Sequence, residues 1–261
     1  MALTRAGIWV LLVLAALNGL FLYFLPGRAD TDYAWAIQPP VNAAFIGAGF
    51  LAGTVATGLV LATATRWRTF STLPPALWVL ASTLLAATII HEDRFKWDYP
   101  PTWVWALVYA GVPLAVPFLV ARQRRAADAE PPADPRLRPV RVLSAIVGAV
   151  LIVGAAALFV APVDLGERWP WPLTPLLGRA VAAWYALFGT MLLSCAIWLR
   201  RPAEALIPYA TLAVWSLLLL ALPILHPDDV SGAGLWIAGM LVLLALSLYG
   251  MRVALPDPAR L

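Results

Sequence analysis

Cysteine is nearly absent from this sequence, and its scarcity excludes several classes of protein. The one cysteine, Cys195, lies inside a long apolar stretch, so there is no disulfide framework and no paired-cysteine metal or redox motif. The GxSxG nucleophile turn and the GxxxxGK[ST] phosphate loop of soluble enzymes are also missing. The sequence therefore indicates no catalytic residue, and it leaves open whether the protein is an enzyme.

Charge is scarce as well. Only 12% of the residues are charged, 62% are hydrophobic and the mean hydropathy is +0.82, values typical of membrane proteins. Lysine occurs once, at Lys96, and the strong preference for arginine indicates a GC-rich bacterial genome. The net charge is +4, and the basic residues are distributed along the chain as the positive-inside rule of membrane proteins requires. We therefore expect no nucleic-acid partner.

Long apolar runs are what the sequence does contain. Eight of them approach the roughly 20 residues that a helix needs to cross a bilayer. The expected spans are Ile8 to Leu25, Val41 to Ala64, Leu73 to Ile90, Trp103 to Ala121, Val142 to Ala161, Leu176 to Leu199, Ala205 to Leu225 and Leu235 to Met251.

The two halves of the chain repeat each other. For about fifty positions, adding 136 to a residue number in the first half gives a matching residue in the second, without a gap. The matches include Arg5 with Arg141, Leu22 with Leu158, Pro26 with Pro162, Trp35 with Trp171, Pro39 with Pro175, Leu51 with Leu187 and Gly53-Thr54 with Gly189-Thr190. This pattern indicates an ancient duplication.

The repeat predicts the fold class. Four spans in each repeat is an even number, so both repeats enter the membrane in the same direction and should be related by a pseudo-two-fold axis along the membrane normal. We therefore expect an all-α membrane protein with eight transmembrane helices in two parallel four-helix repeats. Residues 1–121 form the first repeat, 122–138 a charged, proline-rich linker and 139–261 the second repeat.

The arginines predict the orientation. With a cytoplasmic N-terminus, 13 of the 18 basic residues lie inside, as the positive-inside rule requires. The outside then keeps Arg28, Arg94, Lys96, Arg168 and Arg179. We expect a multi-pass protein of the bacterial plasma membrane with both termini in the cytoplasm.

Two outer loops, 27–40 and 163–175, carry matching aromatic pairs. The pairs are Tyr33 with Trp35 and Trp169 with Trp171, and prolines following them forbid a continuous helix. One interpretation is an aromatic belt at the membrane surface. The other is a pair of symmetric flaps that roof a cavity between the halves, and its candidate ligand-binding residues are Trp35, Gln38, Trp171 and Thr174.

The two histidines end equivalent spans, and acidic residues follow each of them. His91 precedes Glu92, Asp93 and Arg94, and His226 precedes Asp228 and Asp229. Histidine beside a carboxylate can hold a metal, ligate haem or relay a proton. His91, His226 and Asp228 are the candidate ligands for a divalent metal, and two axial imidazoles would suffice for haem. The alternative is that the histidines only cap helix ends. The sequence therefore does not identify a cofactor.

The spans have no Asp, Glu or Lys at their middle, which disfavours an ion-coupled carrier. Arg179 is the charged residue nearest the core, near the outer end of the sixth span. It should pair with an outer acid such as Glu167 or Asp228, or with an anionic ligand. Glu92, Asp93 and Arg94 are further candidate contacts for a ligand.

Small residues form a stripe along the second span at Ala44, Ala48, Ala52 and Ala56, beside Gly49 and Gly53 in GxxxG spacing. Such stripes let helices approach closely. Packing inside one chain is the default expectation, and a homodimer is the alternative.

These observations lead to three hypotheses about function. The first is non-catalytic binding or permeation of a small ligand at an extracytoplasmic cavity between the repeats, which His91, His226 and Arg179 would line. The second is a redox membrane protein with haem or a metal on His91 and His226. The third is an accessory subunit of a larger membrane complex.

Overall fold

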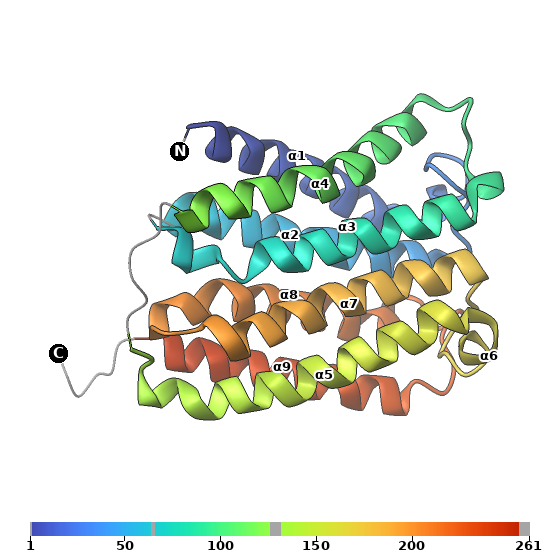
Figure 1. The fold of residues 1–261 in the computed structure, drawn as a ribbon. Helices are drawn as coiled ribbons and strands as arrows, with labels where there is room; N and C mark the ends of the chain where they lie inside the picture. The colour runs from blue at the N-terminus through green and yellow to red at the C-terminus, as the bar shows by residue number, and fades with distance from the viewer. Residues whose placement is uncertain (1, 64–65, 126–131, 256–261) are drawn as a thin grey trace.

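The protein is a bundle of long helices (Figure 1). The computed structural model describes residues 2–63, 66–125 and 132–255. Eight helices of the described part are long and apolar enough to cross a membrane, which confirms the prediction of an all-helical fold with eight helices of that kind. They are α1 (Ala2–Phe24), α2 (Pro40–Thr63), α3 (Leu73–Ile90), α4 (Pro100–Arg125), α5 (Arg138–Val160), α7 (Pro175–Trp198), α8 (Leu206–Leu225) and α9 (Gly234–Ala254).

Short helical turns occupy much of the connections. They are η1 (Pro26–Arg28), η2 (Trp67–Phe70), η3 (Glu92–Arg94), η4 (Pro135–Leu137), α6 (Pro162–Gly166) and η5 (Pro202–Ala205). Proline opens several helices, including α2 at Pro40, α4 at Pro100 and α7 at Pro175. Its fixed φ suits the first helical turn, where a missing N–H costs nothing. The apolar runs between these starts become helices because helices satisfy every backbone polar group internally.

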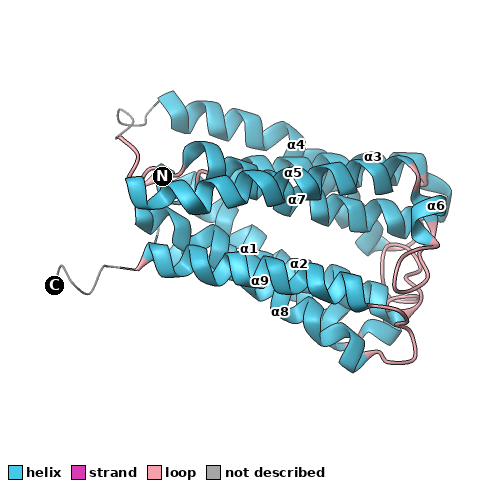
Figure 2. Cartoon of the chain, turned by 90° about the horizontal axis from the view of Figure 1, so that it is seen from below, coloured by secondary structure: helices cyan, strands magenta, loops and turns pink. Residues whose placement is uncertain are grey.

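The eight long helices pack in two rows of four. Contacts order one row as α4, α3, α7, α5 and the other as α1, α2, α8, α9, and both rows are visible edge-on in Figure 2. Each row joins one helical hairpin from the first half of the chain to one from the second. The main helix contacts between the halves are therefore α3 with α7 and α2 with α8, deep inside the rows, and α2 also contacts α7.

Equivalent contacts recur in the two halves. Exchanging each helix for its counterpart about 136 residues along converts one row into the other. The Arg5 guanidinium donates to the Leu61 carbonyl oxygen at 3.4 Å, and Arg141 donates to that of Ile197 at 3.5 Å. At the other end of the bundle, the Lys96 backbone N–H donates to the Ala34 carbonyl oxygen at 2.9 Å. The counterpart of that bond, from Ser231 to Pro170, measures 2.8 Å.

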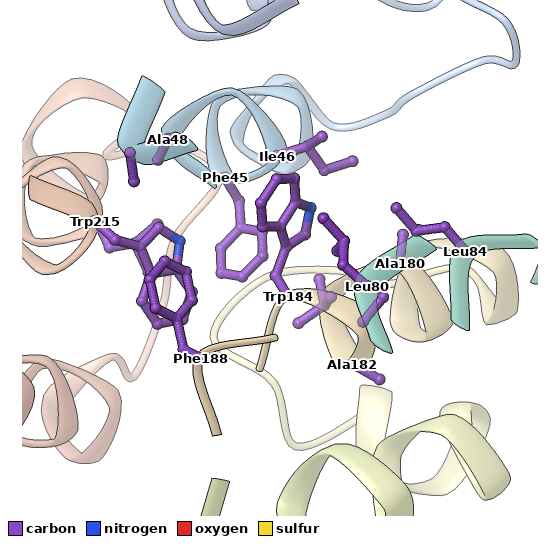
Figure 3. Packing of buried hydrophobic residues seen from close by; sticks show 14 of the residues in the cluster. Phe45, Ile46, Ala48, Leu80, Leu84, Ala180, Ala182, Trp184, Phe188 and Trp215 are labelled. Carbon is purple, nitrogen blue, oxygen red and sulfur yellow. The ribbon is translucent and has the colours of Figure 1, made fainter. Parts of the chain in front are cut away.

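Aromatic side chains fill the contact between the rows (Figure 3). Phe188 stacks on Trp215 with ring centroids 4.0 Å apart. The Trp184 indole lies against Gly49, where an added Cβ would approach its ring to 2.5 Å. The stripe predicted on the second span is buried inside the chain, and its members are Ala44, Ala48, Ala52 and Ala56. Packing within one chain thus uses this face.

A buried carboxylate joins the halves at the end of the bundle that carries both chain termini, hereafter the terminal end. Glu204 accepts from the backbone N–H groups of Arg200 at 2.8 Å and Arg201 at 3.2 Å. Its other oxygen lies 3.5 Å from Nε of Arg68, in the loop between α2 and α3. Because a carboxylate is costly to bury unless it is fully bonded, this arrangement fixes the two loops against each other.

The predicted linker 122–138 is helical at both of its ends. Helix α4 continues to Arg125, and α5 begins at Arg138 directly after η4. Residues 126–131 lie outside the described residues. The backbone N–H of Asp134 donates to the Arg200 carbonyl oxygen at 2.9 Å, which attaches the end of the linker to the loop between α7 and α8.

Candidate functional site

The distal end of the bundle, opposite the chain termini, carries the predicted site residues. Trp35 and Trp171 are both buried, each with 2% of its surface exposed. Trp35 packs edge-on against Trp105 of α4 at 4.6 Å between ring centroids, and Trp171 packs against Trp236 of α9 at 5.2 Å. These two tryptophans therefore belong to the packed core.

The first aromatic residue of each pair lines a groove. Tyr33 lies in a groove of about 540 Å³ between α1 and α4. Trp169 lies in one of about 670 Å³ between α5 and α9. Each of these two grooves is lined by a single half of the chain. A smaller cavity of about 160 Å³ is lined by both halves, including Gly49 and Trp184.

Asn42, in the first turn of α2, connects the halves and was not among the predicted site residues. Its side-chain amide donates to the carbonyl oxygens of Gln38 and Pro172, both at 3.1 Å. Its side-chain oxygen accepts from Nε1 of Trp171 at 2.9 Å. A signal was present in the sequence, since an amide in an apolar helix must find partners for all its polar atoms.

The predicted flap residues Gln38 and Thr174 both form hydrogen bonds with the N-terminal turn of a helix. The Gln38 side chain is exposed, while its carbonyl oxygen accepts from Asn42. Thr174 caps α7, and its hydroxyl oxygen accepts from the Leu177 backbone N–H at 3.3 Å. Threonine is a favoured residue at this position because the cap satisfies a free helix N–H.

His91 and Arg179 meet where the halves join at the distal end. Arg179 Nη1 lies 2.6 Å from Nε2 of His91, which follows the last residue of α3. The guanidinium also lies over the Phe159 ring, 5.6 Å from its centroid. The expected pairing of Arg179 with Glu167 or Asp228 was wrong, because the neutral imidazole takes that place.

The hydrogen bond determines the protonation state of His91. Arginine can only donate, so Nε2 must accept and the ring must be neutral. Burial lowers the pKa of His91 below its usual value, and the Arg179 guanidinium lowers it further, while Asp93 opposes them. At neutral pH this junction therefore carries the positive charge of Arg179 with no charge on the histidine.

His226, at the end of α8, has an acidic neighbour instead. Its Nδ1 lies 3.8 Å from a carboxylate oxygen of Asp229. The same oxygen accepts from the Val41 backbone N–H at the start of α2, at 3.3 Å. Burial lowers the pKa of His226 and Asp229 raises it, so the two effects oppose each other.

The candidate metal ligands are not gathered. Across residues 2–63, 66–125 and 132–255, no group of three or more His, Cys, Asp or Glu side chains is placed to hold a metal. His91 and His226 bind different partners, and Nε2 of His91 is already engaged by Arg179. The described residues therefore offer no set of three donors for a metal ion, and Nε2 of His91 is not free to ligate a haem iron.

The remaining predicted contacts are exposed at the distal surface. Asp93 and Arg94 pair with each other at 3.1 Å. Glu92 accepts from Nε1 of Trp97 through its backbone carbonyl, and Asp228 is exposed beside His226. Such surface ion pairs contribute little to stability or to binding.

Similarity to other proteins adds nothing to this geometry. No protein-family model, curated protein or solved structure matches the chain. Function must therefore be argued from the residues themselves, and Arg179 with His91 is the strongest polar arrangement between the halves.

Proposed function

We propose that the protein is a non-catalytic, multi-pass membrane protein that binds a small anionic ligand at Arg179 and His91. The observation that carries this proposal is a partly buried cation without a counter-ion. Arg179 has no ion pair with any of the described residues, and its Nε is buried without a hydrogen-bond partner. A guanidinium presents several donors in one plane, which suits a carboxylate or phosphate group.

The equivalent junction between the halves, where His226 follows α8 and α2 begins, supports this proposal because it contains a carboxylate of the chain itself. There Asp229 accepts from the start of α2 and lies beside His226. Counting back 136 residues, Ala43 stands at the position of Arg179. The offset of 135 that aligns His91 with His226 places Arg94 at the position of Asp229. One junction thus contains an anion from the chain itself, whereas at the other Arg179 has no counter-ion among the described residues.

We further propose that the two halves are related by a pseudo-two-fold axis along the membrane normal. The exchange of the two helix rows and the recurring Arg5 and Arg141 hydrogen bonds support this relation. The distribution of arginine supports cytoplasmic termini in a bacterial plasma membrane. In that orientation Arg179 and His91 face the extracytoplasmic side.

Anion binding predicts a concentration-dependent rise in stability. Thermal unfolding of the purified protein in an uncharged detergent at pH 7.5, with inorganic phosphate or succinate and with ionic strength held constant, measures it. A ligand at one hundred times its dissociation constant stabilises the native state by about 2.7 kcal/mol. We expect Arg179→Gln to abolish the rise. Arg28→Gln should retain it, because Arg28 is exposed and already paired with Asp32.

The same measurement has a pH signature. Folding lowers the pKa of His91. Neutral His91 therefore contributes its full stabilisation at a pH above the pKa of histidine in the unfolded chain. This stabilisation is lost as the pH falls through the pKa of His91 in the folded protein. A bound anion favours protonated His91, so the stabilisation by phosphate should grow below about pH 6.5 in wild type and not in His91→Gln. Equal stabilisation of wild type and Arg179→Gln by either anion would contradict the proposal.

The orientation is tested by labelling single cysteines in a Cys195→Ala background. Asp98→Cys lies at the distal end and Arg201→Cys at the terminal end, and both parent residues are exposed. A membrane-impermeant thiol reagent should label position 98 in intact cells and position 201 only after permeabilisation. The reverse pattern would invert the orientation.

A further inference from the structure

The groove between α5 and α9, hereafter the second groove, opens sideways through its apolar walls. Its lining includes Ile146 and Val150 from α5 and Leu235 and Val242 from α9, all of them exposed. In a membrane these side chains face lipid, so an occupant would enter from the bilayer. The volume of about 670 Å³ is within the range of ligand pockets in proteins.

The distal end of the second groove presents hydrogen-bond donors. Arg168 is exposed there and forms no ion pair within the described residues. Nε1 of Trp169 is buried and has no hydrogen-bond partner. The Tyr185 hydroxyl accepts from Nε1 of Trp236 at 3.1 Å, so its own proton is free to be donated. All three groups are donors of the kind that a phosphate accepts.

The equivalent groove between α1 and α4, the first groove, differs in these features. Asp32 occupies the repeat position of Arg168, and its carboxylate pairs with Arg28 at 3.2 Å. Tyr33 occupies the position of Trp169, and its hydroxyl donates to the side chain of Asn18 at 3.2 Å. The side chains of Asp32 and Tyr33 therefore have partners within the chain, and the carboxylate would repel an anion.

We infer that the second groove binds a phospholipid with an anionic headgroup, with an acyl chain between α5 and α9 and the phosphate at Arg168 and Trp169. This site is separate from Arg179 and His91, so it goes beyond the proposed function. Charge complementarity selects the lipid class, since a basic residue at a membrane surface favours an anionic lipid by about 1 kcal/mol. The lateral opening selects the bilayer as the source.

Native mass spectrometry of the full-length protein tests the inference. The protein is equilibrated with equal amounts of phosphatidylglycerol and phosphatidylcholine of identical chains, and the retained lipids are counted. Wild type should retain phosphatidylglycerol in preference, and Arg168→Gln should reduce that preference about fivefold. Arg28→Gln removes an arginine that pairs with Asp32 of the first groove; it is the matched control and should leave the preference unchanged. Arg179→Gln should also leave it unchanged, which separates this site from the anion site.

Filling the second groove gives an independent test. A Cβ added at Gly154 or Gly239 meets nothing within 4 Å, so leucine can extend into the groove without a clash. Gly154→Leu with Gly239→Leu should remove the retained lipid while the protein unfolds at or above the wild-type temperature, because leucine favours the helix more than glycine does. Gly111→Leu, also in open space but between α1 and α4, is the control. Equal retention of the two lipids by wild type, or unchanged retention in the filled variant, would overturn the inference.

Discussion

Replacing Gly47 with alanine is expected to lower the free energy of unfolding by about 1 to 3 kcal/mol, the usual cost of an added methyl group in a filled core. The new Cβ would lie 2.5 Å from the Tyr23 backbone nitrogen and 2.9 Å from the Leu22 carbonyl carbon. These atoms belong to the backbone of α1 and cannot move aside by changing a rotamer. Helices α1 and α2 would have to separate where they cross.

A second glycine of α2 provides the control for this prediction. At Gly58 the nearest atom to an added Cβ is Cδ1 of Leu12, at an ordinary 3.8 Å. Gly58→Ala should therefore be neutral or should stabilise the helix by up to about 1 kcal/mol, the difference in helix propensity. Thermal unfolding of both variants in detergent makes the comparison. If Gly47→Ala unfolds at the same temperature as Gly58→Ala, the crossing is not as tight as the structure has it.

Replacing Asn42 with leucine should cost about 2 to 4 kcal/mol. The substitution leaves Nε1 of Trp171 and the Pro172 carbonyl oxygen without their partner, and each unsatisfied buried group costs about 1 to 3 kcal/mol. Leucine has the same number and branching of side-chain heavy atoms as asparagine, so most of the loss should come from the unsatisfied polar atoms. The measurement is again the unfolding midpoint in detergent.

A double-mutant cycle separates the hydrogen bond from general packing. Trp171→Phe removes the indole N–H, so it should cost less in the Asn42→Leu background than in wild type. Additive effects of the two substitutions would show that the bond at 2.9 Å contributes nothing to stability.

The positions of the spans were predictable because a long apolar run in a membrane has few alternatives to a helix. The predicted third span ends at Ile90, as α3 does, and the predicted seventh ends at Leu225, as α8 does. In both helices the apolar run stops at a histidine, which follows the last helical residue. The boundary is therefore set by the same polar residue that marks it in the sequence.

The neighbours of each helix were not predictable from hydropathy. A helix that contacts lipid on one side and protein on the other is apolar on both, so its inward face carries little sequence signal. Trp35 and Trp171 illustrate the difficulty, since an indole suits a membrane surface as well as a core. The pairing of Arg179 with His91 depends on α3 lying against α7, a contact between halves that no local pattern encodes.

The interleaving of the two hairpins in each row has a consequence for biosynthesis. When the first four spans have been inserted, the inner faces of α2 and α3 have no partner, because α8 and α7 are still to be translated. Lipid can cover these apolar faces in the meantime. The Asn42 side chain cannot complete its bonds until Trp171 and Pro172 arrive. The ribosome must therefore deliver nearly the whole chain before the bundle can close, and the first half waits in the membrane as an unfinished set of helices.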